Sequence, residues 1–112
     1  MSSRDVQRLR DMRHATQKAL SFTENRNRSD LDRDEMLALA LVRLLEIIGE
    51  AARYVPVEIK EKYPEVPWSQ IASTRNRLIH GYFAVDLDIV WSIVRQDLPS
   101  LLLQLEGILH ED

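Results

Sequence analysis

The chain has 112 residues, of which 45% are hydrophobic and 29% charged, a length that supports one domain with a single modest core. It contains no cysteine, which excludes disulfide bonds and thiolate metal sites. The formal net charge of −3 and the pI near 5.6 argue against a protein built to coat nucleic acid over its whole surface. Its basic residues are 12 Arg and 3 Lys. Arginine binds carboxylates and phosphates bidentately, which lysine cannot do.

Nothing in the chain resembles a targeting or membrane segment. The first ten residues, MSSRDVQRLR, carry four charges and no apolar stretch of the signal-peptide kind. The longest apolar run, Met36 to Val42, is far shorter than a bilayer span. We therefore expect residues 1–112 to form a single cytoplasmic domain with no membrane segment.

The periodicity of the chain predicts an all-α protein. There are only three Gly and four Pro, no stretch alternates apolar and polar residues over strand length, and the periodic segments are long. We expect an antiparallel four-helix up-and-down bundle. Its first helix runs from Ser3 to Thr23, with an apolar stripe at Val6, Leu9, Met12, Thr16, Ala19 and Leu20.

The second helix has a capping pattern at its start. With Asp32 as N-cap, Glu35 completes a capping box, and Leu31 opposes Met36 as a hydrophobic staple. The helix is expected to run to about Val55, before Pro56, and its first half is apolar nearly all round, which calls for cover on several sides. Gly49, close to two alanines, marks a point where another backbone can approach.

Two further helices complete the expected bundle, with a short extra helix at Val57 to Tyr63 between the second and the third. The third helix is predicted from Trp68 to His80, with Gly81 as its C′ residue. The last is predicted from Asp86 to Leu109, kinked by Pro99.

The stretch from Ser73 to Phe83 combines residue types that bind anions and transfer protons in enzymes. Arg75, Asn76, Arg77, His80 and Tyr82 place two cations, an amide, a histidine that titrates near neutral pH and a phenol within eight positions. On one continuous helix Asn76 and His80 share a face. The helix dipole at that end disfavours phosphate, so Arg75, Arg77 and a protonated His80 must offset it to form a local anion site. The alternative is a helix end decorated with ordinary basic residues.

Other titratable residues receive structural interpretations. Glu46 and Glu50 are spaced i,i+4 on the second helix, and we expect them to be structural partners of buried arginines, with Arg43 and Arg53 as candidates. The three histidines lie far apart in the sequence, so neither a metal site nor a cofactor is predicted.

The residues from Arg75 to Tyr82 resemble the motif of the HEPN superfamily, which is Arg, four residues, His, any residue, Tyr. Within that superfamily the chain is similar to the HepT-like toxins encoded beside a minimal nucleotidyltransferase antitoxin. The sequences IIGEAA, from residue 47, and VDLDIVW, from residue 85, also resemble the family's second and last helices. The resemblance therefore extends over nearly the whole chain.

The resemblance implies a HEPN-like bundle and a metal-independent ribonuclease that works as a homodimer, with two copies of the motif facing each other. Arg75 and His80 would be the catalytic pair and Asn76 a supporting polar residue. Arg77 is expected to bind phosphate because of its place in the local anion site, not because of the resemblance. Tyr82 would accept AMP from the partner nucleotidyltransferase, which neutralises a toxin of a type VII-like system. The implied substrate is RNA, with tRNA as one candidate.

Two other interpretations remain open at this stage. The chain could be a non-catalytic helical partner that holds a nucleotide or substrate for a nucleotidyltransferase, or a plain dimeric scaffold. The arginines of the first helix, Arg4, Arg8, Arg10 and Arg13, are expected to form a solvated face, with contact to RNA as the other option.

Overall fold

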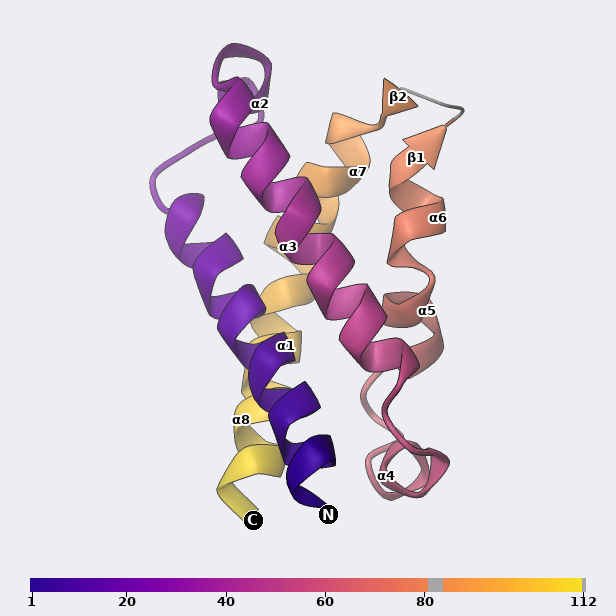
Figure 1. The fold of residues 1–112 in the computed structure, drawn as a ribbon. Coiled ribbons are helices and arrows are strands. Elements are labelled where there is room, and N and C mark those ends of the chain that lie inside the picture. The colour runs from indigo at the N-terminus through magenta and orange to yellow at the C-terminus, as the bar shows by residue number, and fades with distance from the viewer. Residues whose placement is uncertain (81–83, 112) are drawn as a thin grey trace.

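The computed structural model describes residues 1–80 and 84–111, with the side chains of residues 79, 80 and 111 outside the description. Helices account for nearly all of its regular structure, and they alternate in direction along the chain (Figure 1). The elements are α1 (Ser3–Phe22), α2 (Asp30–Arg33), α3 (Glu35–Arg53), α4 (Val57–Lys62), α5 (Trp68–Ala72), α6 (Thr74–Leu78), β1 (Ile79–His80), β2 (Ala84–Val85), α7 (Leu87–Ser92), the π-helix η1 (Ile93–Asp97) and α8 (Leu98–Glu111).

Helix α3 lies at the centre of the packing. It contacts α1 along its length and meets α5, α6 and α7, while α8 packs against α1 (Figure 1). The core between these helices includes Leu41, Leu45 and Ile48 of α3, each at most 2% exposed. The all-α class predicted from the sequence is confirmed, with one two-residue antiparallel pair, β1 and β2, added to it.

Helix α1 follows its predicted bounds to within one residue and buries most of the predicted stripe, while Val6 and Leu20 are half-buried. Ser2 caps it, because its side chain accepts a hydrogen bond from the Asp5 amide while the Asp5 carboxylate accepts one from the Ser2 amide. Its buried residues are Leu9, Met12, Ala15, Thr16 and Ala19.

The predicted start of the second helix is wrong. Asp32 lies inside the short helix α2, and Asp34 caps α3 instead, its carboxylate accepting from the Leu37 amide at 3.0 Å. The staple fails with the cap, since Leu31 is buried while Met36 is 83% exposed. Asp30, Asp32 and Asp34 all have the residue type of an N-cap, so residue type alone does not identify the one that caps α3.

The close approach predicted at Gly49 is confirmed. A Cβ atom at this position would lie 3.0 Å from the Ile71 carbonyl oxygen and 3.5 Å from the Thr74 Cβ. Helix α3 and the α5–α6 segment therefore cross backbone to backbone at Gly49.

The predicted third helix is broken and ends early. Its two halves, α5 and α6, are separated at Ser73, whose hydroxyl donates to the Gln70 carbonyl at 2.9 Å, and the Thr74 hydroxyl donates to the Ile71 carbonyl at 2.6 Å. Hydroxyls that bond local carbonyls in this way compete with the helix ladder. Helix α6 ends at Leu78 and the next residues form β1, so the prediction of a helical His80 sharing a face with Asn76 is wrong.

The last segment begins as predicted and is irregular in its middle. The Asp86 carboxylate accepts from the Asp88 and Ile89 amides at 3.0 and 3.1 Å, which caps α7. The disturbance expected from Pro99 takes the form of the π-helix η1 immediately before it. A proline lacks the amide that an α-helix needs, and a π-turn is one of the known ways in which a helix accommodates such a break.

Candidate functional site

A polar cleft of about 480 Å³ lies between α3 and the α5–α6 segment. We call it the α3–α6 cleft. Helix α3 lines one wall, and the α5–α6 segment lines the other. The lining residues are Arg43, Glu46, Gly49, Glu50 and Arg53 from α3, and Ala72, Arg75 and Asn76 from α5 and α6.

The wall from α3 follows from helical spacing. Residues 43, 46, 50 and 53 fall at intervals of three and four, so they occupy one face of α3. Gly49 keeps α3 close to the opposite wall, because it has no side chain to hold the two backbones apart. The predicted site residues Arg75 and Asn76 therefore lie in the same cleft as Glu46 and Glu50.

The cleft carries three arginines that no acidic side chain of the described chain pairs with. The side chains of Arg43, Arg53 and Arg75 are exposed, and within residues 1–80 and 84–111 they form no ion pair. The expectation that Glu46 and Glu50 neutralise buried arginines is not met, since these arginines are not buried. Exposed guanidinium groups without partners can hold an anion bidentately.

Asn76 completes the wall beside Arg75. Its side chain is exposed, and no hydrogen bond joins it to the rest of the described chain. It also borders an open surface hollow that α4 and α5 line, together with Arg53 and Ala72. The α3–α6 cleft thus continues past Asn76 onto the surface beside α4.

The strand β1, whose second residue is His80, follows directly on α6. His80 pairs with Ala84 in the antiparallel β1–β2 ladder, and the Asp86 amide donates to the Leu78 carbonyl at 2.8 Å just below that ladder. The ladder therefore holds the backbone of residue 80 close to the end of α6. Arg75, on α6, lies five residues before His80 in the sequence. Tyr82 lies outside the described residues, as does the predicted C′ residue Gly81.

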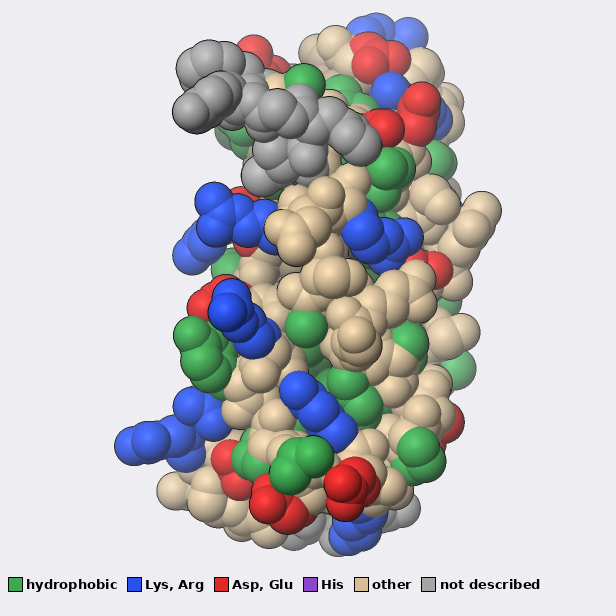
Figure 2. All heavy atoms as spheres, turned by 90° about the vertical axis from the view of Figure 1, so that its right-hand side faces the viewer, with side chains coloured by type: hydrophobic (Ala, Val, Ile, Leu, Met, Phe, Trp, Pro, Cys, Tyr) green, Lys and Arg blue, Asp and Glu red, His purple; other side chains and the backbone are tan. Residues whose placement is uncertain are grey.

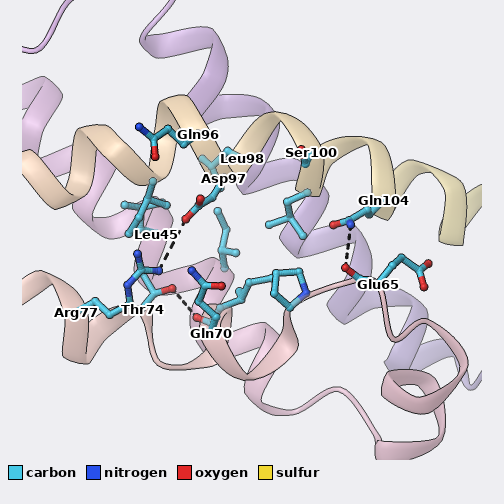
Figure 3. A pocket seen from close by; sticks show the side chains of 15 residues that line it. Leu45, Glu65, Gln70, Thr74, Arg77, Gln96, Asp97, Leu98, Ser100 and Gln104 are labelled. Atoms are coloured by element: carbon cyan, nitrogen blue, oxygen red, sulfur yellow. Dashed lines mark hydrogen bonds and ion pairs between the residues drawn. The ribbon is translucent and has the colours of Figure 1, made fainter.

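Arg77 lies on the other side of α6. Its guanidinium is 3.8 Å from the Asp97 carboxylate of η1, and it lines a second pocket of about 290 Å³ between α5–α6 and η1–α8 (Figure 3). Two residues along an α-helix turn through about 200°, so Arg75 and Arg77 were bound to point apart. The two-residue spacing in the sequence therefore already indicates that Arg75 and Arg77 lie on opposite faces of the helix. The structure brings Arg75 and Asn76 together and not Arg77.

The described side chains on the surface beside the cleft form no continuous basic patch (Figure 2). Seen from the side of α4, α5 and α6, Lys and Arg side chains lie apart from one another with acidic side chains between them (Figure 2). Such a surface attracts an anion at a few defined points rather than along its whole face.

Among the described residues, no three His, Asp or Glu side chains come close enough together to hold a metal ion. No helix in this part of the chain is long and apolar enough to cross a bilayer.

Fold and cleft together define an all-helical protein with an arginine-bearing polar cleft between α3 and the α5–α6 segment. Comparison with known proteins identifies the family: the model for the ribonuclease HepT-like family matches residues 12–108. The chain belongs to this family, as its motif predicted, and its enzyme class is ribonuclease.

Individual relatives align with this chain over most of their own length. An inferred RNase of Methanocaldococcus jannaschii is 38% identical, with 95% of this chain and 98% of the relative covered. A protein of Thermococcus cleftensis named "Probable ribonuclease HepT" is 40% identical over 83% of this chain and 84% of its own length. An inferred RNase of Caldanaerobacter subterraneus is 43% identical over 74% of each chain. No solved structure matches significantly.

Proposed function

We propose that the protein is a metal-independent endoribonuclease that works as a homodimer and is the toxin of a type VII-like toxin–antitoxin pair. The observation that carries the proposal is Arg75, exposed and without an ion pair in the described chain, in a cleft beside Asn76 and five residues before His80. An uncommitted guanidinium at that place is available for the phosphate of RNA.

The chemistry needs few protein groups because RNA carries its own nucleophile. The ribose 2′-oxygen attacks the adjacent phosphorus, the bond from phosphorus to the 5′-oxygen breaks, and the products are a 2′,3′-cyclic phosphate and a 5′-hydroxyl. A base takes the proton of the 2′-hydroxyl, and an acid gives one to the leaving 5′-oxygen. His80 serves in one of these roles, while Arg75 holds the non-bridging oxygens as negative charge builds on them.

A dimer supplies a histidine for each of the two proton transfers. One chain has one His80, whereas cleavage uses a base and an acid, and a two-fold partner supplies the second histidine. The apolar start of α3 supports this arrangement, since Met36 is 83% and Leu39 is 61% exposed. These residues lie on the same helix as Arg43 and Glu46, so an interface over them would bring a second copy to the α3–α6 cleft.

Silencing follows from the position of Tyr82 in the motif. An AMP group esterified to its hydroxyl would put a bulky anion two residues from His80 and seven from Arg75. That anion would occupy the guanidinium that otherwise holds the substrate phosphate. The partner nucleotidyltransferase would thus inactivate the enzyme without unfolding it.

The test is cleavage of RNA by the purified protein with a chelator present. We expect the unaltered protein to release products with 2′,3′-cyclic phosphate ends, and His80→Ala to lose about 100-fold or more in rate. Circular dichroism checks that the variant keeps its helices. Equal cleavage by both proteins, or a requirement for a divalent metal, contradicts the proposal.

A second experiment addresses Tyr82. Tyr82→Phe should cleave RNA at close to the normal rate but resist silencing when the neighbouring nucleotidyltransferase and ATP are added. If both forms are silenced equally, the modification lies elsewhere.

A further inference from the structure

A further hollow, of about 250 Å³, lies between α1 and α3. We call it the α1–α3 groove. It shares two lining residues, Arg43 and Glu50, with the α3–α6 cleft. The two hollows therefore meet across one face of α3, and a strand lying in the cleft can continue into the groove.

Tyr54 forms an aromatic wall of this groove. It follows directly on α3, and its side chain is 54% exposed. The Arg8 guanidinium lies 5.7 Å from the centre of the Tyr54 ring and donates to the Tyr54 carbonyl at 3.1 Å. An exposed ring that a cation holds in position is a surface on which a flat base can stack.

Apart from Arg8 and Tyr54, the groove is lined by two apolar residues, two carboxylates and the guanidinium of Arg43. Ile47 and Ala51 are partly buried against the core. Asp11 and Glu50 contribute carboxylates, and Glu50 makes no hydrogen bond or ion pair within the described part of the chain. Carboxylates repel phosphate and only accept hydrogen bonds, so the group that fits between the Tyr54 ring and the Glu50 carboxylate is uncharged, flat and edged with N–H donors.

We propose that the α1–α3 groove binds one unpaired nucleobase of the RNA substrate, a base with an exocyclic amino group, stacked on Tyr54 and hydrogen-bonded to Glu50. The inference rests on the proposed ribonuclease function and adds a specificity subsite to it. Guanine fits best, because its adjacent ring N–H and amino group present two donors to one carboxylate. Uracil presents a single N–H between two carbonyl oxygens, which a carboxylate repels.

Arg43 links the subsite to the reacting phosphate. It lines both hollows, and its guanidinium has no ion pair in the described residues. A nucleotide whose base lies on Tyr54 would place its own phosphate near Arg43, while the next phosphate along the strand approaches Arg75. The subsite thus selects the bond that is cut by holding a base at a set distance from it.

The experiment measures binding apart from cleavage. In the inactive His80→Ala protein, fluorescence anisotropy gives the affinity for a short oligouridine strand and for the same strand with one guanosine. We expect the guanosine strand to bind at least about fivefold more tightly. Tyr54→Ala should weaken its binding about tenfold or more, and Tyr54→Phe, which keeps the ring, should stay within about twofold.

Matched variants separate stacking from edge recognition. Glu50→Gln should abolish the preference for guanosine over uridine, because an amide presents a donor as well as an acceptor. Phe22→Ala is the control, since Phe22 is a 44% exposed ring at the end of α1 and does not line the groove. It should bind both strands as the parent does.

The outcomes distinguish this inference from the proposed function. If Tyr54→Ala and Glu50→Gln bind both strands as the parent does while Arg75→Ala loses binding, the base subsite is refuted and the ribonuclease stands. If the parent binds no RNA and the active protein cuts none, the proposed function falls and the inference with it. If guanosine monophosphate alone displaces the strand at equal concentration, the groove serves a free nucleotide and the inference is overturned.

Discussion

Two regions of the molecule are rich in arginine, and they use it in opposite ways. Around α2, which we call the α2 corner, Arg26, Arg28 and Arg33 are paired with aspartates of α2, of its flanks and of α7. In the α3–α6 cleft, Arg43, Arg53 and Arg75 have no ion pair among the described side chains. The first group ties chain segments together, and the second leaves its charge available to a ligand.

The pKa values in the α2 corner reflect this pairing. A hydrogen bond from Arg28 to the Asp88 carboxylate at 2.6 Å raises the pKa of Arg28. The backbone amide of Asn27, 2.8 Å from the Asp30 carboxylate, lowers the pKa of Asp30, and Arg33 lowers it further. Counting arginines cannot separate the two regions, because the difference lies in which carboxylates the fold brings near.

The largest expected effect tests whether the uncommitted arginines carry the reaction. Arg75→Ala should lower the rate of RNA cleavage on the order of 10²–10³-fold, because it removes a donor to the charge that develops on phosphorus. Arg75→Lys should recover only part of that loss, since an ammonium cannot hold two oxygens at once. The measurement is a single-turnover cleavage rate.

The matched control comes from the other region. Arg28→Ala removes an arginine of the α2 corner and should leave the cleavage rate within about twofold, while exposed ion pairs of this kind contribute little to stability because solvent screens them. Equal losses of activity in Arg75→Ala and Arg28→Ala would erase the distinction between the two regions.

The next effect concerns the crossing that forms the cleft. Gly49→Val should lower the free energy of unfolding by about 1–3 kcal/mol, because its methyl groups meet the Ile71 carbonyl and the two walls must move apart. Gly49→Ala should change it by less than about 1 kcal/mol, since a gain in helix propensity offsets the tight contact. Urea unfolding gives both values. A Val variant as stable as the parent would show that the crossing tolerates side chains.

A third prediction tests the structural use of arginine on η1. The Arg95 guanidinium donates to the Thr23 and Arg26 carbonyls at 2.6 and 2.9 Å and lies 4.5 Å from the Trp91 ring centre. Arg95→Ala should cost about 1–2 kcal/mol of stability with cleavage unchanged. Arg10→Ala, an exposed arginine of α1, is the control for both readouts. A loss of cleavage greater than the loss of stability explains would place Arg95 among the functional arginines.

The smallest effect is a pH dependence in the α2 corner. Because the pKa of Asp30 is lowered in the folded state, its contribution to stability is present above its unfolded pKa and is lost as pH falls through its folded pKa. Asp30→Asn should therefore melt slightly below the parent at neutral pH, and the difference should shrink as the solution becomes strongly acid. A difference in melting temperature that is constant with pH would assign the effect to something other than this carboxylate.

The motif and the helical periodicity predicted the family and much of the fold from the sequence. The all-α class, the bounds of α1 to within one residue, the start of the last helical segment at Asp86 and the close approach at Gly49 all follow from local rules of spacing, capping and side-chain size. The family also followed from the residues between Arg75 and Tyr82. These features depend on neighbours within a few positions, which the sequence displays directly.

Other features were decided only when distant segments packed. Which aspartate caps α3, where the third helix breaks and whether Glu46 and Glu50 meet buried arginines depend on contacts between residues far apart in the chain. The same holds for Arg77, which pairs with Asp97 across to η1 rather than joining Arg75 in the cleft. Residue types and their spacing identified the chemistry, but the partners that each charge acquires, and so which arginines are left for a substrate, were set by the tertiary fold.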